Sequence, residues 1–441
     1  MGTTFRPYNP KQDLLLPPSL RDWLEEGHLA YFIDEVVDEL DLCAFYRPYK
    51  GNGRRKSPYD PSLMLKILLY GYATGVFSSR KIAKKLREDV AFRVLGADNF
   101  PSHRTIRAFR QRHLSDFKSI FIQVVQIAHE AGLASLGTIT VDGTKVKANA
   151  SKRKAMSYGR MQQDEKKLGN EIEALCKEAN RTDNKEDDLY GEAQRGDELP
   201  EELKRREDRL SKIREAKERL EAAQRDKDEA KGRHKDDDRK PPRGGHKYKR
   251  DFGVPDDKAQ SNFTDPESKI MKTGNTFNQC YNGQLGVDKD QQIIVENKLT
   301  NSGTDNKELL DVVSGIESNL GKKASTVLAD AGYRSEDNIK GLSDQGIDAY
   351  INLGRKSKPP QEIDAEKYPA TRKMAEKLMT DSGKTCYAQR KWIAEAPNGW
   401  IKQILGFRQF SVRGLKKVQG EWDLVCLSLN LRRMNSLMVF E

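Results

Sequence analysis

The sequence lacks any long hydrophobic run. Its 441 residues contain no uninterrupted apolar stretch of the roughly 18 residues that a membrane-spanning helix requires. The most apolar segment, Leu63–Phe77, is interrupted by Lys66 and suits a buried helix instead. The first residues also lack the basic start, apolar stretch and cleavage site that are typical of a secretory signal. We therefore expect a protein that is neither inserted in a membrane nor exported.

Cysteine and histidine are scarce. The cysteines are odd in number and contain no Cys-x-x-Cys pair, which argues against both a disulfide framework and a thiolate zinc site and suits a reducing cytoplasm. The five cysteines are Cys43, Cys176, Cys280, Cys386 and Cys426. None of the six histidines forms a pair with the spacing of metal ligands. A Ser/His/Asp or Cys/His constellation for nucleophilic catalysis is absent as well.

Charge is abundant and unevenly distributed. The chain has 78 Lys and Arg against 67 Asp and Glu, a formal net charge of +11. Between Ser151 and Arg250 there are 29 basic and 25 acidic residues, so this segment is distinct from its neighbours. Its end, His234–Arg250, has a composition typical of a flexible basic loop. Within the segment a rough heptad spacing predicts a coiled-coil-like helix, paired with an earlier helix near residues 164–180. The heptad residues are Leu203, Leu210, Ile213 and Leu220.

The N-terminal quarter of the chain has the pattern of short amphipathic helices. From residue 18 to about residue 114, apolar residues recur every three or four positions. In the last of these helices, which begins near Ser102, Arg104, Arg107 and Arg110 fall at helical spacing on one side. A basic stripe of this kind after two short helices suits the recognition helix of a helix-turn-helix. The alternative is that these arginines only solvate an exposed helix face.

The hydrophobic period changes after Gly137. The β-branched segment Thr138–Val141, the turn-like Asp142-Gly143 and the alternating residues that follow predict two strand segments or one bent strand. Beyond the charged segment, the pattern predicts a hairpin, a helix, a strand, a helix and a strand, in that order. These elements are expected at residues 283–297, 307–320, 325–330, 337–345 and 347–352. This succession describes a mixed sheet with helices on its faces.

Three acidic residues stand out by their context. Asp142 and Asp330 each end a predicted strand, and Glu395 lies near the start of a later helix. Carboxylates at the ends of neighbouring strands can converge on Mg²⁺, which prefers oxygen ligands and keeps positions open for water and phosphate. Two such ions can support an in-line phosphoryl transfer. Each acid alone also has a structural explanation, because Asp-Gly is a common turn dipeptide and any carboxylate is favoured at a helix start.

Several short motifs accompany these acids. Tyr387, Arg390, Glu395 and Lys402 approximate a Y-x2-R-x3-E-x6-K signature, in which only the arginine-to-glutamate gap is one residue longer. Lys391 stands at the expected spacing, so which of the two cations serves is open. Further motifs are Thr140–Thr144, Tyr281–Gln284, Ala329–Tyr333 and a tail over Gly406–Leu431. In order and number these motifs resemble those of the DDE transposases of bacterial insertion sequences, over nearly the whole chain.

The resemblance implies an RNase H-like catalytic core in which Asp142, Asp330 and Glu395 hold two Mg²⁺ or Mn²⁺ ions. Enzymes of this family cut double-stranded DNA at the terminal inverted repeats of their own element and join the freed 3′-hydroxyl to target DNA. Because two DNA ends must be paired, we expect a homodimer in the DNA complex. The expected location is the bacterial cytoplasm, in association with the nucleoid.

By analogy with the family, the residues around the glutamate position DNA phosphates. These residues are Tyr387, Arg390, Lys391 and Lys402. Such contacts give salt-sensitive affinity without sequence specificity, so recognition of a particular DNA end needs base contacts from elsewhere. The helix that carries Arg104, Arg107 and Arg110 is the first candidate for these contacts, and the basic loop over 235–250 is the second.

The expected organisation combines an all-α N-terminal DNA-binding domain with an α/β catalytic core that a helical insertion interrupts. The expected boundaries are 1–130 for the N-terminal domain, 131–154 and 261–441 for the two parts of the core, and 155–260 for the insertion with its basic loop. Two alternatives remain at this point. One is an RNase H-like metal-dependent nuclease without strand transfer, and the other is a non-catalytic DNA-binding or scaffold protein.

Overall fold

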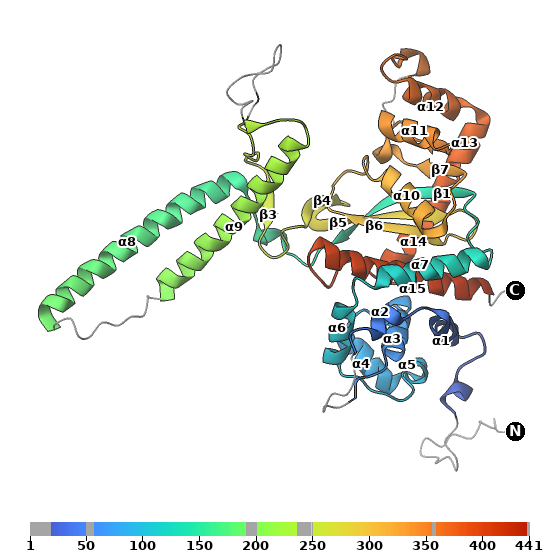
Figure 1. The fold of residues 1–441 in the computed structure, drawn as a ribbon, viewed down its shortest axis with the longest axis horizontal. Helices are drawn as coiled ribbons and strands as arrows, with labels where there is room; N and C mark the ends of the chain where they lie inside the picture. The colour runs from blue at the N-terminus through green and yellow to red at the C-terminus, as the bar shows by residue number, and fades with distance from the viewer. Residues whose placement is uncertain are drawn as a thin grey trace, which may run out of the picture.

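The computed structural model describes residues 19–49, 57–190, 201–235, 248, 250–354 and 359–438. Figure 1 shows a group of N-terminal helices, a mixed sheet with helices packed around it, and a helical hairpin that projects away from the sheet. The predicted mixed α/β class with a helical N-terminal region is thereby confirmed. In the described part of the chain, no helix has the length and apolar character needed to cross a membrane. Most of the predicted basic loop over 235–250 lies outside the described residues.

The N-terminal helices begin where the sequence supplies capping groups. The Asp60 carboxylate accepts a hydrogen bond from the Ser62 amide at 2.8 Å, ahead of a proline at the first helical position. The Ser102 hydroxyl accepts from the Thr105 amide at 3.2 Å and starts the arginine-bearing helix. The elements of this region are η1 (Leu20–Trp23), α1 (Leu29–Glu39), α2 (Cys43–Tyr46), α3 (Pro61–Ala73), α4 (Ser79–Glu88), α5 (Val90–Leu95), α6 (His103–Arg112) and α7 (Phe117–Glu130).

The main sheet has six strands, in the order β4-β5-β1-β7-β8, and β6 pairs with the later part of β5, following the part that pairs with β4. Strands β4, β5, β6 and β1 pair antiparallel, whereas β1, β7 and β8 pair parallel. The segment around Asp142 forms one continuous strand rather than two. The strands are β1 (Thr138–Lys147), β4 (Lys269–Thr273), β5 (Thr276–Asp288), β6 (Ile294–Thr300), β7 (Thr326–Ala329) and β8 (Asp348–Ile351).

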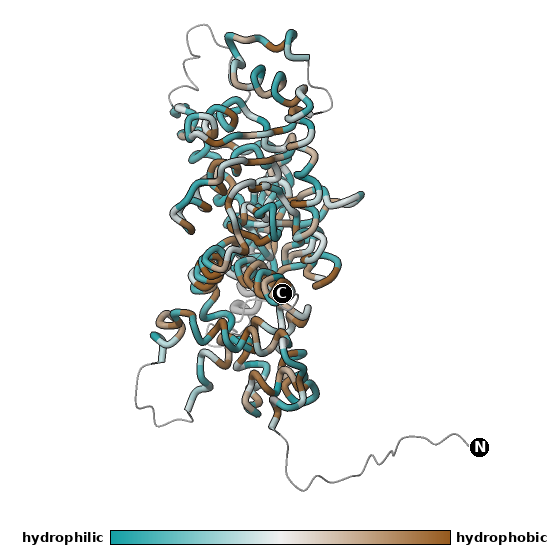
Figure 2. The backbone as a smooth tube through the Cα atoms, turned by 90° about the vertical axis from the view of Figure 1, so that its right-hand side faces the viewer, coloured by the Kyte–Doolittle hydropathy of each residue, from teal (hydrophilic) through white to brown (hydrophobic). Residues whose placement is uncertain are grey.

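A long C-terminal helix, α15 (Leu415–Met438), lies between the sheet and the N-terminal helices (Figures 1 and 2). It packs on α7, α3 and β6, and it is buried around most of its circumference. Trp422 is fully buried against Gly283 of β5, where an added Cβ would lie 2.8 Å from its ring. The remaining helical elements of the sheet region are α10 (Leu309–Leu320), η4 (Ala331–Tyr333), α11 (Glu336–Asp344), η5 (Pro360–Glu362), α12 (Pro369–Met379), α13 (Asp381–Ala388), α14 (Arg390–Gly399) and the π-helical η6 (Trp400–Ile404).

The charged segment forms the projecting hairpin. The hairpin consists of α8 (Tyr158–Tyr190) and α9 (Glu201–Glu229). It is preceded by the short elements η2 (Lys152–Lys154) and β2 (Ala155–Ser157) and followed by β3 (Gln260–Asn262). Strands β2 and β3 pair with each other. The small core of the hairpin contains Met161, Leu168, Leu210, Ile213 and Ala216. Ion pairs of Glu165 with Arg214 at 3.1 Å and with Lys217 at 2.9 Å link the two helices. The predicted helix pair is therefore present, and its coiled-coil character stays a prediction.

Candidate active site

The parallel pairing of β1 and β7 brings two of the predicted acids together. The register runs from Thr138 opposite Thr326 to Val141 opposite Ala329, so Asp142 and Asp330 follow at the same level. Asp330 caps the turn η4, since its Oδ1 accepts a hydrogen bond from the Gly332 amide at 2.8 Å.

The Asp142 carboxyl group is largely buried, and its pKa is perturbed. Burial raises this pKa to about 6, Arg390 opposes the rise, and the negative charges of Asp330 and Asp305 add to it. Asp142 therefore lies within the electrostatic reach of two other carboxylates. Positive charge placed among these three carboxylates would reduce their mutual repulsion.

Helix α14 supplies part of that positive charge. The Arg390 guanidinium lies 3.5 Å from Asp142 Oδ1, and the Asn398 side chain donates to Asp142 Oδ2 at 2.9 Å. Two helical turns separate these residues, so they share one face. Buried Ile393 and Pro397 anchor the helix. Asn398 was not predicted from the sequence, because an asparagine next to Pro397 has no distinguishing pattern.

Glu395 lies on the same helix three residues before Asn398, but its side chain is exposed. Among the residues that the structure describes, no three Asp, Glu, His or Cys side chains are grouped so that they could hold a metal ion. The structure thus places Asp142 next to Asp330 and leaves Glu395 outside this pair. The role of Glu395 stays a prediction.

The predicted phosphate-binding residues lie at different depths. Lys402 lies in the π-helical turn η6 and is partly buried. Burial lowers the pKa of its ammonium group, whereas Asp142 and Cys280 raise it. Lys402 is therefore close to Asp142 in space. Tyr387 is half-buried in α13, and Lys391 is exposed. Of the two cations at the alternative spacings, Arg390 is the one that contacts Asp142.

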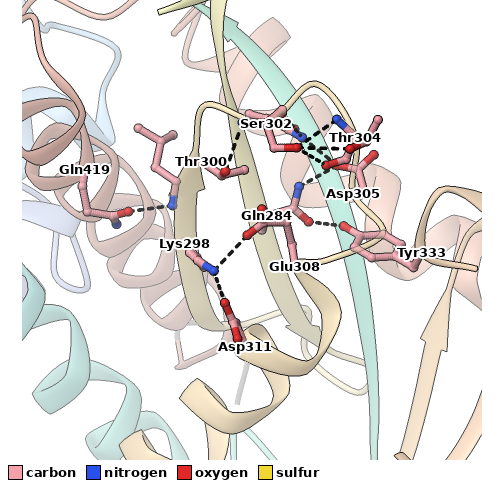
Figure 3. A network of polar contacts seen from close by, with 12 residues as sticks. Gln284, Lys298, Thr300, Ser302, Thr304, Asp305, Glu308, Asp311, Tyr333 and Gln419 are labelled. Carbon is pink, nitrogen blue, oxygen red and sulfur yellow. Dashed lines mark hydrogen bonds and ion pairs between the residues drawn. The ribbon is translucent and has the colours of Figure 1, made fainter. Parts of the chain in front are cut away.

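A polar network that includes Gln284, Asp305 and Tyr333 is drawn in Figure 3. It adjoins the aspartate pair, because Asp305 approaches Gly143 and Gly332, which are close neighbours of Asp142 and Asp330 in the sequence. Asp305, in the connection between β6 and α10, accepts hydrogen bonds at Oδ1 from Asn282 at 2.6 Å and from Gln284 at 2.7 Å. The buried Tyr333 hydroxyl donates to Gln284 Oε1. Asn282, Gln284 and Tyr333 belong to motifs that the sequence had singled out without a role. Asp305 was missed, because it lies in a polar connection without hydrophobic periodicity.

The arginines predicted to contact DNA separate into two kinds. Arg104 and Arg107 are exposed on α6, as a DNA-binding surface requires. Arg110 is buried, and its Nη1 donates to the Tyr72 hydroxyl and to the Phe77 carbonyl oxygen, each at 2.9 Å. The expectation that Arg110 contacts DNA is wrong for this conformation, because its guanidinium is enclosed within the fold.

Two family models match the chain. The model described as Transposase domain (DUF772) matches residues 18–112, which include α1–α6. The model described as Transposase DDE domain matches residues 245–431, which include Asp330 and Glu395, whereas Asp142 lies outside both matches. No curated protein and no solved structure matches the chain. The two matches, one on either side of the charged hairpin, are both to transposase domains and support a DDE transposase enzyme.

Proposed function

We propose that this transposase carries out metal-dependent cleavage at the terminal inverted repeats of its element and then joins the freed 3′-hydroxyl to target DNA. The observation that carries the proposal is the placement of Asp142, within β1, beside Asp330, which follows the end of the parallel strand β7, with α14 docked on Asp142. In our proposal Asp142, Asp330 and Glu395 are the three acids of the site.

The strand order supports an RNase H-like core. Strands β6, β5 and β1 form an antiparallel unit, to which β7 and β8 add in parallel. Asp142 lies within the central strand β1, at the level where its parallel neighbour β7 ends and Asp330 follows. We assign the Y-x2-R-x3-E-x6-K branch on the residues of α13, α14 and η6, with Arg390 as the signature arginine because of its contact with Asp142.

The residues fit divalent cations. Burial and two neighbouring negative charges disfavour the ionised form of Asp142, and a cation of high charge density with a preference for oxygen ligands relieves both effects. Asp142, Asp330 and Glu395 would hold two Mg²⁺ or Mn²⁺ ions, which when bound supply charge stabilisation for a phosphoryl transfer. We infer that docking of a DNA end brings Glu395 toward the aspartates.

The protein's own groups position the DNA. Asn398 fixes the orientation of the Asp142 carboxylate through its hydrogen bond. Arg390 contacts Asp142, and Lys402 lies within electrostatic reach of it. Both would bind phosphates beside the cleaved bond, with Tyr387 and Lys391 as further contacts of the same region. Arg104 and Arg107 would contact DNA from α6. A homodimer that pairs two DNA ends is part of the proposal, as is association with the nucleoid.

The test uses three conservative variants of the full chain. Asp142→Asn, Asp330→Asn and Glu395→Gln should each abolish Mg²⁺-dependent strand cleavage of DNA that contains the terminal repeats, while DNA affinity stays close to that of the wild type. Asp381→Asn is the control, because its carboxylate is fully exposed at the start of α13. Cleavage retained by any of the three variants removes that residue from the site.

A second assay separates transposition from plain hydrolysis. A precut 3′-end is supplied together with an intact plasmid, and covalent joining is measured. Cleavage without joining favours a nuclease, whereas DNA binding that is indifferent to Mg²⁺ and yields no cleavage favours a non-catalytic DNA-binding protein.

A further inference from the structure

We propose that Asp305 is a further carboxylate ligand of the cation site, and that it draws together with Asp142 and Asp330 when a cation binds, because no three such groups of the described residues are already arranged for an ion. This inference rests on the proposed function, because it assumes that the aspartates hold divalent cations. Asp305 belongs to neither the signature motif nor the predicted triad.

Two glycines make room for Asp305. An added Cβ at Gly143, next to Asp142, would lie 2.7 Å from Asp305 Oδ1 and 2.9 Å from Gln284 Nε2. An added Cβ at Gly332 would lie 2.9 Å from Asp330 Oδ1 and 3.2 Å from Asp305 Oδ2. Because Gly143 and Gly332 have no side chains, the Asp305 carboxylate can approach the backbone close to Asp142 and Asp330.

The two carboxylates at Gly332 are close enough to share bound cations. Asp330 Oδ1 and Asp305 Oδ2 are both near the same Cβ position, so they lie at most about 6 Å apart, within the span of a hydrated site with one or two divalent ions. Amide donors from Asn282 and Gln284 hold Asp305 Oδ1, which turns Oδ2 toward Gly332. In the described part of the chain, neither Asp305 nor Asp330 forms an ion pair with Lys, Arg or His. Within the described residues, no ion pair with a protein cation therefore offsets the repulsion between the Asp305 and Asp330 carboxylates.

Unpaired amide oxygens flank the acids and point to a ligand. Asn282 is 1% exposed and donates through Nδ2 to Asp305, yet its buried Oδ1 has no hydrogen-bond partner within the described residues. Asn398 repeats the arrangement on the other side, donating to Asp142 with its Oδ1 buried and unpaired. Buried acceptors are almost always satisfied, so donors are missing here. Water molecules in the coordination shell of a divalent cation are donors of the required kind.

A competing role for Asp305 is purely structural. Through Gln284 it is linked to Tyr333, and Tyr333 belongs to the turn that carries Asp330. Asp305→Asn separates the two roles. The asparagine oxygen still accepts the two amide hydrogen bonds, while the charge and the ligand oxygen facing Gly332 are lost.

The experiment measures Mn²⁺ binding to the full chain by the electron paramagnetic resonance signal of free Mn²⁺. Asp305→Asn should weaken Mn²⁺ binding at least about tenfold, as expected when a group of the site is removed. Asp311→Asn is the matched control, because this exposed carboxylate of α10 pairs with Lys298 and should change the affinity less than about twofold. Thermal unfolding followed by circular dichroism should give a midpoint within about 2 °C of the wild type for both variants.

Unchanged Mn²⁺ affinity in Asp305→Asn, whether or not cleavage is lost, overturns the proposal and assigns Asp305 to the support of the turn. Asp142→Asn is measured in parallel. If that variant loses Mn²⁺ and Asp305→Asn does not, the proposed function stands while the role of Asp305 fails. If the wild type itself binds no Mn²⁺, both fail.

Discussion

Replacing Arg110 with methionine tests whether this arginine serves the fold rather than DNA. The Tyr72 hydroxyl accepts from Arg110 and donates to Glu421 Oε1 at 3.0 Å, so it bridges an arginine of α6 and a carboxylate of α15. Glu421 is fully buried. Methionine keeps much of the apolar stem of the arginine and removes the charge.

The size of the effect follows from what remains around Glu421. Removing one partner of a buried ionic group costs about 3–5 kcal/mol, because the other charge stays buried. Glu421 keeps the Tyr72 hydroxyl, the Ser411 amide at 2.7 Å and the Ser411 hydroxyl at 2.5 Å. These three donors stabilise its carboxylate, so we expect a loss near the lower end, about 3 kcal/mol. Adding Glu421→Gln should restore more than half of this loss.

The assay is urea unfolding of the full chain, compared with Arg107→Met. Arg107 is exposed on the same helix, so its replacement should change the unfolding free energy by less than about 0.5 kcal/mol. It should instead weaken binding to terminal-repeat DNA by about 1–3 kcal/mol and relax the sequence preference, as expected for a lost base contact. An Arg110→Met protein as stable as the wild type, but with the DNA-binding defect expected for Arg107, would refute this reasoning.

Two further predictions concern the core. Gly420→Ala should destabilise the protein by about 1–3 kcal/mol or more in urea unfolding, because the new Cβ would lie 2.0 Å from the Leu114 carbonyl oxygen. The cost of this clash exceeds the gain of about 1 kcal/mol expected from replacing a helical glycine with alanine. Gly399→Ala is the control, because no atom lies within 4 Å of the added Cβ. Burial raises the pKa of Asp423 from 3.8 to about 7, so the folded state holds this proton more tightly than the unfolded chain does. The stabilisation from this proton is fully present below pH 3.8 and is lost as the pH rises through about 7. Asp423→Asn should flatten this decline in the free energy of unfolding. An equally steep decline in the variant would contradict the assignment of the decline to Asp423.

Local patterns predicted much of the fold. The alternation around Val141 and the β-branched run before Asp330 gave strands β1 and β7, and the turn between β5 and β6 was apparent from its polar residues. What local patterns do not contain is the pairing of distant segments. Arg110 continues the spacing of Arg104 and Arg107, yet its partners Tyr72 and Glu421 come from other helices, so its burial has no signature within α6.

The candidate site was predictable where chemistry coincides with a strand end. Asp330 met that condition, whereas Asp142 lies inside the longer strand β1 rather than at its end; the parallel register with β7 still places the two side by side. Asp305 and Asn398 did not, because a polar connection and a helix position after a proline carry no periodic signal. Their assignment depends on distances that only the folded chain supplies.

The strand pair β2–β3 has a consequence for how this protein can change. Ser157 pairs with Gln260, so the chain leaves for the hairpin and returns from it through a single closed ladder. Because closing a loop costs only about 0.6 kcal/mol more for each doubling of its length, segments of very different size can be grafted at this junction. We therefore expect that the hairpin can be replaced by one of another length. The distance between Asp142 and Asp330 in the fold would stay the same, because β1 and β7 pair independently of the hairpin.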